Sequence, residues 1–425
     1  MLGTNPQTLT ARVGSILLFA LVVVLGHTAQ AQTFSVLHAF TNGGDGGEPW
    51  AGLTVDAGGN LYGTATSGGY TGGNCETYHG CGTVFRLKSG SFGWTLSPLY
   101  TFNDRDGSSP FAGVIFGPDG TLYGTTYEGG AYMAGTVYNL RPPATACKSV
   151  LCPWTENVLW SFQTETEDGA VPGFGNLTFD TVGHIYGTTI YGGGLADGGT
   201  VFELAKQPSG SWSENINYSF GYIDNGNGGS EPYAGVIFDA NANLYTTTNY
   251  DGAYQCGTVA QLENSPSGWT ENVLYTFTCR SDGGEPFGGL IFDQAGNLYG
   301  TTSGFQGSGT VFELSPSNGG WTFDVIYTFT SGGSWAGVTM DAAGNLYGTG
   351  GVGAYGHGAV FKLTRSGSSW TYSSLHDFTG GSDGGGPVGG VAFDAHGNLY
   401  GTTANGGNLS DCDGSGCGVV WEITP

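Results

Sequence analysis

One short block recurs seven times along the chain: an apolar run, a glycine turn, and a segment close to Leu-Tyr-Gly-Thr-Thr. The Leu-Tyr step, which is Ile-Tyr once, begins at Leu61, Leu122, Ile185, Leu244, Leu298, Leu346 and Leu399. Successive copies lie 61, 63, 59, 54, 48 and 53 residues apart. A period of this size indicates one supersecondary unit copied seven times. The repeat therefore constrains the architecture strongly, and it constrains the activity hardly at all.

Each copy has the pattern of four β-strands. In the fifth copy, residues 289–293 form an apolar run that predicts a strand buried on both faces, and Gly296 provides the turn to a second strand at 298–302. Residues 309–314 alternate with period two, and residues 321–329 form a longer stretch of β-forming residues. Four antiparallel strands in about 50 residues are typical of a β-propeller blade.

The two ends of the chain carry complementary parts of one repeat. The last copy stops after its third strand at 418–423, and the chain has an unaccompanied fourth strand at 36–40 that matches 273–277 and 374–378. An N-terminal strand that completes the last sheet would cover its exposed edge. We therefore predict an all-β, seven-bladed β-propeller with four antiparallel strands per blade, the seventh blade closed by the N-terminal strand.

Residues 1–31 have the pattern of a secretory signal peptide. Arg12 is their single charged residue, residues 16–25 are apolar, and Ala29-Gln30-Ala31 gives a small-x-small cleavage pattern. Ten apolar residues are too few to cross a bilayer, which takes about 20. We expect residues 32–425 to form a single propeller domain without a transmembrane segment, secreted to the extracellular space or the periplasm.

The eight cysteines fall into local pairs: Cys75 with Cys81, Cys147 with Cys152, Cys256 with Cys279, and Cys412 with Cys417. An even number in an exported chain predicts disulfides, and no pair has the C-x2-C spacing of a zinc site.

The charge balance limits the kinds of partner. The chain has 34 acidic and 10 basic residues and a formal net charge of −24. Such a surface repels phosphate backbones and anionic lipid, so we expect no nucleic-acid partner. We predict a monomer whose partners are glycans or an extracellular protein.

The recurring Gly-Asn-Leu-Tyr-Gly-Thr-Thr, followed by Gly-Thr-Val-Phe and Leu-Tyr-Thr-Phe, resembles the GloVer tandem-repeat proteins of bacteria. The resemblance covers the whole chain after the signal peptide. It implies export, and some members carry a C-terminal surface anchor. This chain departs from those members, because it ends at Thr424-Pro425 without an apolar tail, and whether it is attached to a surface stays open. Kelch propellers are similar in architecture only, since the nine residues from Phe85 to Trp94 exceed the kelch spacing.

Two residue types recur in nearly every copy, which favours a structural role over a functional one. Six tryptophans share one repeat position: Trp94, Trp154, Trp212, Trp269, Trp321 and Trp370. Six aspartates begin the inner hairpin: Asp56, Asp180, Asp239, Asp293, Asp341 and Asp394. We predict that the tryptophans pack the blades and that the aspartates bond the turn backbone. Their spacing lacks the dense oxygen pattern of a calcium loop, so calcium has no support and we predict no cofactor and no metal site.

The best candidate for a binding surface is the face that carries the long loops. In propellers the blade-to-blade loops and the loops between strands two and three emerge on the same side, and in this chain both are rich in aromatic residues. Our candidate ligand-binding residues are Trp50, Tyr127, Tyr132, Tyr191, Tyr233, Tyr250, Tyr254, Trp335 and Tyr355. Flat rings with nearby hydroxyls and carboxylates suit carbohydrate. The alternative is that these tyrosines only fill gaps in glycine-rich loops.

No catalytic motif stands out, so we predict no catalytic residues. A glycosidase needs a specific pair of carboxylates, and sequence alone does not select a pair from 34 acidic residues. The sequence thus favours a secreted, non-catalytic propeller that binds extracellular carbohydrate or a protein partner. A polysaccharide-active hydrolase or lyase, and a structural component of the cell envelope or matrix, remain the alternatives.

Overall fold

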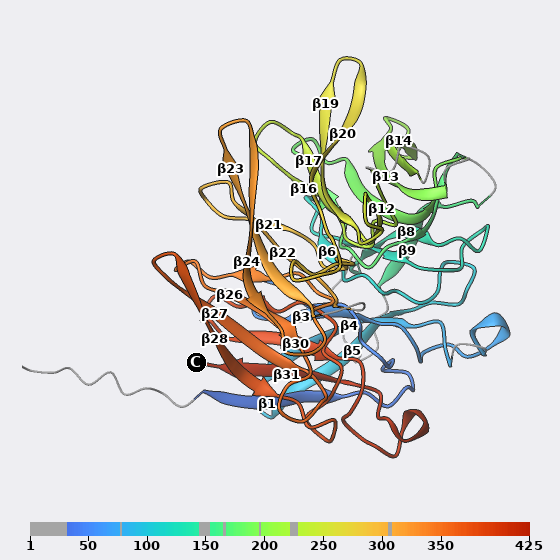
Figure 1. Cartoon of the computed structure of the whole chain (residues 1–425). Helices are drawn as coiled ribbons and strands as arrows, with labels where there is room; N and C mark the ends of the chain where they lie inside the picture. The colour runs from blue at the N-terminus through green and yellow to red at the C-terminus, as the bar shows by residue number, and fades with distance from the viewer. Residues whose placement is uncertain are drawn as a thin grey trace, which may run out of the picture. The chain divides into compact units, whose positions relative to one another are not determined.

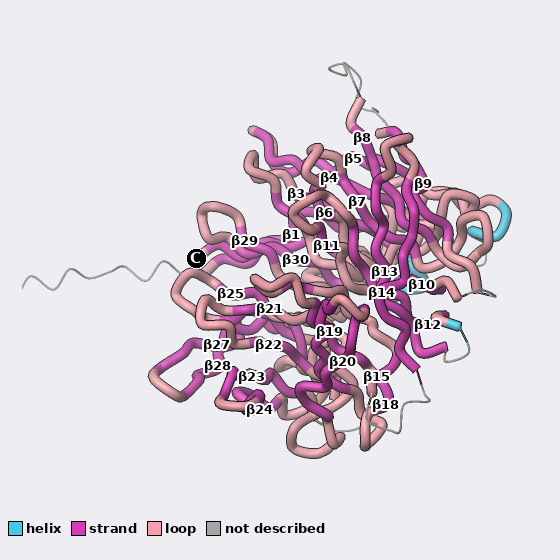
Figure 2. The backbone as a smooth tube through the Cα atoms, turned by 90° about the horizontal axis from the view of Figure 1, so that it is seen from above, coloured by secondary structure: helices cyan, strands magenta, loops and turns pink. Residues whose placement is uncertain are grey.

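Each repeat folds into an antiparallel sheet, and in six of the seven blades the four strands follow one another in sequence order (Figure 1). The seven sheets surround a channel lined by residues from all of them. The computed structural model describes residues 32–76, 79–143, 154–164, 167–194, 197–221, 228–304 and 308–425. Residues 1–31 lie outside this range, so the signal peptide stays a prediction. Figure 2 shows strands and loops almost throughout, with helix confined to short segments, of which Gly73–Glu76 and Cys412–Gly414 are 3-10 turns.

The strands are numbered along the chain, and within each blade they run from the channel outward. Blade one contains β2 (Thr54–Val55), β3 (Leu61–Ala65), β4 (Thr83–Gly90) and β5 (Gly93–Thr101). Blade two contains β6 (Ile115–Phe116), β7 (Leu122–Thr126), β8 (Thr136–Arg141) and β9 (Thr155–Ser161). Blade three contains β11 (Thr178–Phe179), β12 (Ile185–Gly192), β13 (Asp197–Lys206) and β14 (Trp212–Gly221), and β10 (Gly169–Pro172) also pairs with β12.

Blade four contains β16 (Ile237–Phe238), β17 (Leu244–Thr248), β19 (Thr258–Ser265) and β20 (Gly268–Thr276). The short pair β15 (Gly229–Ser230) and β18 (Tyr250–Asp251) lies in its loops. Blade five contains β21 (Ile291–Phe292), β22 (Leu298–Thr301), β23 (Thr310–Ser317) and β24 (Gly320–Thr328). Blade six contains β25 (Thr339–Met340), β26 (Leu346–Gly350), β27 (Ala359–Ser366) and β28 (Ser369–Asp377).

Blade seven combines the two ends of the chain. It contains β29 (Ala392–Phe393), β30 (Leu399–Thr403), β31 (Val419–Thr424) and, outermost, β1 (Thr33–Ala39). Strand β1 pairs antiparallel with β31 from Thr33 opposite Thr424 to Ala39 opposite Val419, and the two lie side by side in Figure 1. The predicted seven-bladed fold and its closure by the N-terminal strand are confirmed.

The innermost strands are shorter than the sequence pattern suggests. The apolar run at 289–293 predicts five residues of strand, whereas only Ile291–Phe292 pairs with β22. The residues before β21 face the channel, where the first segments of the seven blades come together. No further strand is available there as a partner. The apolar run at 289–293 therefore serves both to line the channel and to pair with β22.

The two threonines of the repeated block make different hydrogen bonds, one between neighbouring blades and one within its own blade. In blade five, Thr301 Oγ1 donates a hydrogen bond of 2.7 Å to the backbone oxygen of Ala336 in blade six. Equivalent bonds join Thr64 to Ala112, Thr188 to Ala234, Thr247 to Gly288, Thr349 to Gly389 and Thr402 to Ala51. Thr302 instead bonds within its own blade, where its Oγ1 accepts from the backbone N–H of Thr310 at 2.8 Å. One threonine thus joins neighbouring blades and the next joins strands two and three.

The aspartate of the inner hairpin holds its turn, as predicted. Asp293 Oδ1 accepts from the backbone N–H groups of Ala295 and Asn297 at 2.8 Å, and its Oδ2 accepts from the side chains of Asn297 and Tyr299. Burial opposes ionisation of Asp293, but these donors outweigh it and lower its pKa. Blade two has Gly117 at this position, and Asp119 bonds Thr121 and Tyr123 in its place.

The repeated tryptophans pack one blade against the preceding one. Trp94, Trp154, Trp321 and Trp370 contact the tyrosine of the repeated block in the preceding blade, at centroid distances of 6.0 to 6.4 Å. All six tryptophans lie partly buried against apolar clusters, so their predicted packing role is confirmed.

Three of the four predicted disulfides are present: Cys75–Cys81, Cys256–Cys279 and Cys412–Cys417. Cys256 precedes β19 and Cys279 follows β20, which are adjacent antiparallel strands. The pair Cys147 and Cys152 lies outside the described residues. Among the residues that are described, no helix is long and apolar enough to cross a membrane.

Candidate functional site

Six aromatic side chains converge at one end of the channel. We call Trp50, Phe111, Phe174, Tyr233, Phe287 and Trp335 the aromatic collar; each stands shortly before the innermost strand of its blade. Their centroids follow one another at 5.5, 4.9, 5.5, 4.6 and 4.8 Å, and Trp335 meets Trp50 again at 5.9 Å. Blade seven contributes Val388 at this position, and the contact between Trp335 and Trp50 spans it. The collar is therefore a closed circuit of ring contacts made by six blades.

The blade-to-blade loops position the collar through an unusual backbone conformation. Glu285, just before Pro286 and Phe287, has a φ of 51°, in the left-handed region that non-glycine residues seldom occupy. Its N–H donates to Cys256 O at 2.8 Å in the preceding blade, and its carbonyl accepts from Ser303 N at 3.2 Å. Glu48 and Glu231 share this conformation, with φ of 53° and 55°. In all three glutamates the backbone N–H and the backbone carbonyl are hydrogen-bonded. These bonds hold the following proline and aromatic residue in place.

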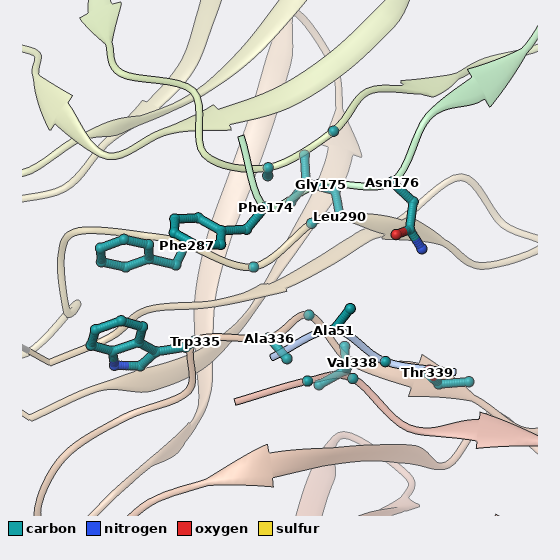
Figure 3. Close-up of a pocket in the computed structure, with 18 of the residues that line it drawn as sticks. Ala51, Phe174, Gly175, Asn176, Phe287, Leu290, Trp335, Ala336, Val338 and Thr339 are labelled. Carbon is teal, nitrogen blue, oxygen red and sulfur yellow. The ribbon is translucent and has the colours of Figure 1, made fainter. Parts of the chain in front are cut away.

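Below the collar lies a cavity of about 340 Å³, lined by residues from all seven blades. Figure 3 shows Phe287 and Trp335 on one side of the lining and Asn176 and Thr339 on the other. The intervening wall consists mainly of glycine and alanine backbone with Leu53, Leu290 and Val338. Among the described residues that line it, none is charged. This is a small, largely apolar chamber with an aromatic entrance.

Three tyrosines, Tyr127, Tyr191 and Tyr233, lie in or beside the collar. Tyr127 contacts Phe111 at 5.2 Å and Phe174 at 6.1 Å, and Tyr191 shares a hydrogen bond with Tyr233. Burial, followed by the charge of Glu231, raises the pKa of Tyr191 and of Tyr233. For Tyr127, burial is again the largest cause of a raised pKa, and Glu231 contributes. These hydroxyls therefore stay protonated and can donate hydrogen bonds.

The structure brings together five of the nine candidate residues. Trp50, Tyr233 and Trp335 belong to the collar, and Tyr127 and Tyr191 adjoin it. Within the described chain, Tyr132, Tyr250, Tyr254 and Tyr355 make no ring contact with the collar. Tyr132, Tyr254 and Tyr355 are 54%, 59% and 64% exposed. Both kinds of long loop share one face, because Gly47 bridges to Ser67, Ser108 to Glu128 and Gly385 to Asn405.

The candidate set omitted residues that the structure places in the site. Phe111, Phe174 and Phe287 complete the collar, and their common repeat position was a usable signal. Asn176 lines the cavity at a position where the other blades have glycine. The charge of Glu231 raises the pKa of three tyrosines, which its sequence context alone does not indicate.

An Asp-Gly pair recurs in the blade-to-blade loops, as at Asp282-Gly283 and Asp383-Gly384, and the carboxylates of these two aspartates accept hydrogen bonds from local donors. Asp282 accepts from the Tyr275 hydroxyl at 3.0 Å and from Thr278 N at 2.8 Å, and Asp383 accepts from His376 Nε2 at 3.0 Å and Thr379 N at 3.0 Å. Burial opposes ionisation of Asp282, yet these bonds lower its pKa. Across the part of the chain that the structure describes, no three His, Cys, Asp or Glu side chains are grouped to hold a metal ion. These aspartates anchor loops to the outermost strands.

Fold and site together define a seven-bladed β-propeller with an aromatic-collared central channel. Within this class, the chain belongs to the Gloeobacter/Verrucomicrobia repeat family, whose model matches residues 22–155, 74–305 and 264–425. The resemblance seen in the repeated block is thereby confirmed. No curated protein sequence gives a significant match to the chain.

Two solved structures show the range of distant similarity to this chain. One is a candidate oxidoreductase (glucose dehydrogenase) from Thermus thermophilus, with 14% identity, a TM-score of 0.44, and coverage of 92% of this chain and 100% of that one. Another is a candidate 6-phosphogluconolactonase from Bacteroides fragilis, with 17% identity, a TM-score of 0.46, and coverage of 82% and 87%. At these values neither activity is transferred to this chain.

Proposed function

We propose that the protein is an exported, non-catalytic module that binds extracellular carbohydrate through its aromatic collar. The observation that carries the proposal is the closed circuit of six rings around the channel mouth, with the hydroxyls of Tyr127, Tyr191 and Tyr233 beside it. Sugar rings present apolar faces that pack on aromatic rings and hydroxyls that need hydrogen-bond partners. The collar offers both within one surface.

Export is part of the same proposal. The signal pattern in residues 1–31 supports it, and so do the three disulfides, because disulfides persist in oxidising compartments. Loops on a rigid scaffold are also where binding residues commonly lie. The partner is proposed to be a glycan rather than a protein, since the collar encloses a small chamber and not a broad flat patch.

The test is a glycan-array screen of the exported protein, followed by calorimetry on the best ligand with Trp335→Ala. Trp335 is 41% exposed within the collar, so its loss removes a stacking surface with little effect on the core. We expect affinity to fall about tenfold or more, because an aromatic contact contributes about 1 kcal/mol beyond its burial. Phe92→Ala is the matched control, since Phe92 is fully exposed at the turn between β4 and β5.

Equal loss of binding in both variants would contradict a site at the collar. A blank array with folded protein would contradict carbohydrate binding itself and favour the structural alternative. Release of sugar from a polymer by the wild-type protein would instead support the hydrolase or lyase.

A further inference from the structure

The cavity is lined by the polar side chains of Asn176, Thr178 and Thr339, and of these Asn176 stands where every other blade has glycine. The residue that follows each collar position by two lines the cavity in every blade but the second, whose Gly113 lies beside Asn176. These residues are Gly52, Gly113, Asn176, Gly235, Gly289, Gly337 and Gly390. Six blades thus present a bare backbone, and blade three presents a carboxamide. Because Asn176 lies at the channel and not between blades, the packing of the blades does not explain why it replaces glycine.

Close approach of backbone requires glycine at three of these positions, Gly52, Gly235 and Gly337. A Cβ on Gly235 would lie 2.4 Å from Asn176 O, and one on Gly337 would lie 2.4 Å from Gly289 O. A Cβ on Gly113 would lie 2.9 Å from Asn176 Oδ1, so Gly113 leaves room for the carboxamide. Asn176 is exposed although it lines the cavity, and no hydrogen bond of its side chain is found among the described residues. The carboxamide, with two donor hydrogens and an acceptor oxygen, is therefore available to a ligand.

The lining restricts the ligand's charge and size. A buried charge without a partner is costly, and no described lining residue carries one, so the ligand part inside the channel is uncharged. A volume of about 340 Å³ lies near the lower end of ligand pockets, which span about 300–1,000 Å³. Such a chamber accommodates one small unit rather than a run of polymer. The aromatic collar at its mouth would stack that unit or its neighbour.

We infer that Asn176 is the specificity-determining residue of this site, and that the ligand enters end-on as the uncharged terminal unit of a glycan. This inference rests on the proposed carbohydrate binding and adds the location, the part of the glycan recognised, and the residue that recognises it. It makes the site a single one per molecule, although the scaffold that builds it is repeated seven times.

The experiment is calorimetry on the full exported protein with neutral gluco-, xylo-, manno- and galacto-oligosaccharides of one to six units. For whichever series binds, affinity should level off after the first two or three units.

Asn176→Gly restores the residue of the other six blades, so the fold should survive, as circular dichroism would verify. We expect it to lower affinity about tenfold, the effect of losing about one good hydrogen bond. The double variant N176G/G289N moves the carboxamide to blade five, where a Cβ meets nothing within 4 Å. It should not recover wild-type affinity.

The outcomes separate this inference from the proposed function. Wild-type affinity in Asn176→Gly, together with weakened binding in Trp335→Ala, would overturn the role of Asn176 and leave carbohydrate binding intact. Affinity that rises with every unit up to six would overturn end-on entry in favour of a groove along the face. Recovery in the double variant would show that the position in blade three is not selective. Failure of the folded wild-type protein to bind any series would overturn both proposals.

Discussion

Each residue of the Leu-Tyr-Gly-Thr-Thr block has a distinct physical task, and the glycine shows this most clearly. In blade five a Cβ on Gly300 would lie 2.4 Å from Phe312 Cζ and 2.9 Å from Leu290 Cδ2. Gly300 is paired with Phe312 across β22 and β23, and five other blades pair glycine with an aromatic residue in the same way. Blade four is the exception, where Thr246 faces Ala260. The two positions thus change together within one chain, because only one of them can be large.

Gly300→Ala should lower the free energy of unfolding by about 1–3 kcal/mol, the usual effect of adding a methyl group to a filled core. Gly320→Ala, at an exposed position where a Cβ meets nothing within 4 Å, should change stability little and serves as the control. Urea denaturation measures both. Equal stability of the two variants would mean that Phe312 can move aside at no cost.

Blade four provides a complementary measurement at the same scale. Ala260→Phe should destabilise the protein because the ring would meet Thr246. The double variant T246G/A260F recreates the pair of the other blades, so the two changes should be less harmful together than their sum, with a coupling of about 1 kcal/mol or more. Strict additivity would show that the two positions do not share space.

At the scale of elements, the ring closes through one strand contributed by the far end of the chain. Strand β1 covers β31 along its whole length, from Thr33–Thr424 to Ala39–Val419. The Phe34 ring of β1 also stacks on His376 of blade six at 3.6 Å. The strand therefore completes blade seven and contributes to the interface with blade six.

Deletion of residues 32–41 should uncover the hydrogen-bonding edge of β31 and promote aggregation, because an unpaired strand edge is a template for another chain. Light scattering and thermal unfolding of the truncated protein would measure this. A truncated protein that stays monomeric and melts at the wild-type temperature would contradict closure by β1.

At the scale of the whole molecule, the seven interfaces between blades are chemically unequal. At one equivalent position of the outermost strand, blades five, six and seven carry rings that stack on the preceding blade, such as Phe323 on Tyr275 at 3.7 Å. Blades two, three and four carry Glu156, Glu214 and Glu271 there instead. Glu271 accepts from the Tyr218 hydroxyl at 3.1 Å, and Glu214 is hydrogen-bonded to Asp168. Three of the seven interfaces are therefore joined by stacked rings and three by partly buried carboxyl groups, while blade one has Leu96 at this position.

These carboxyl groups make stability depend on pH. Burial, followed by the charge of Asp106, raises the pKa of Glu156 to about 8, and burial with the adjacent Asp168 raises that of Glu214. A carboxyl whose pKa is higher in the folded state stabilises the protein fully below its unfolded pKa of about 4.3. That stabilising contribution is lost as the pH rises through the pKa that the carboxyl has in the folded state. The melting temperature of the wild-type protein should therefore fall between pH 5 and pH 9.

Glu156→Gln and Glu214→Gln keep the neutral form at every pH, so their melting temperatures should fall less over this interval. The aspartates of the inner hairpins do not contribute to this trend, because their pKa values are lowered and they titrate below it. Parallel melting curves for the wild-type and glutamine proteins from pH 5 to pH 9 would contradict protonated carboxyl groups at these interfaces.

The sequence by itself determined the number of repeats, the four-strand pattern, the closing strand and the three disulfide pairs that the described residues contain. These features depend on residue order and on period-two or turn patterns, which are local and repeat seven times. The roles of Asp293 and Trp321 were predictable for the same reason, since their recurrence marked them as parts of the scaffold.

Only the tertiary structure decided which residues share the channel mouth. Trp50 and Trp335 are far apart in the sequence, and their contact at 5.9 Å exists because the ring closes and because blade seven has a valine between them. The spacing of repeats gives the strand on which a residue stands, but not how far its ring reaches toward the axis. The cavity, the gathering of Tyr127, Tyr191 and Tyr233, and the position of Asn176 depend on that reach, so they emerged only when the blades were placed around one channel.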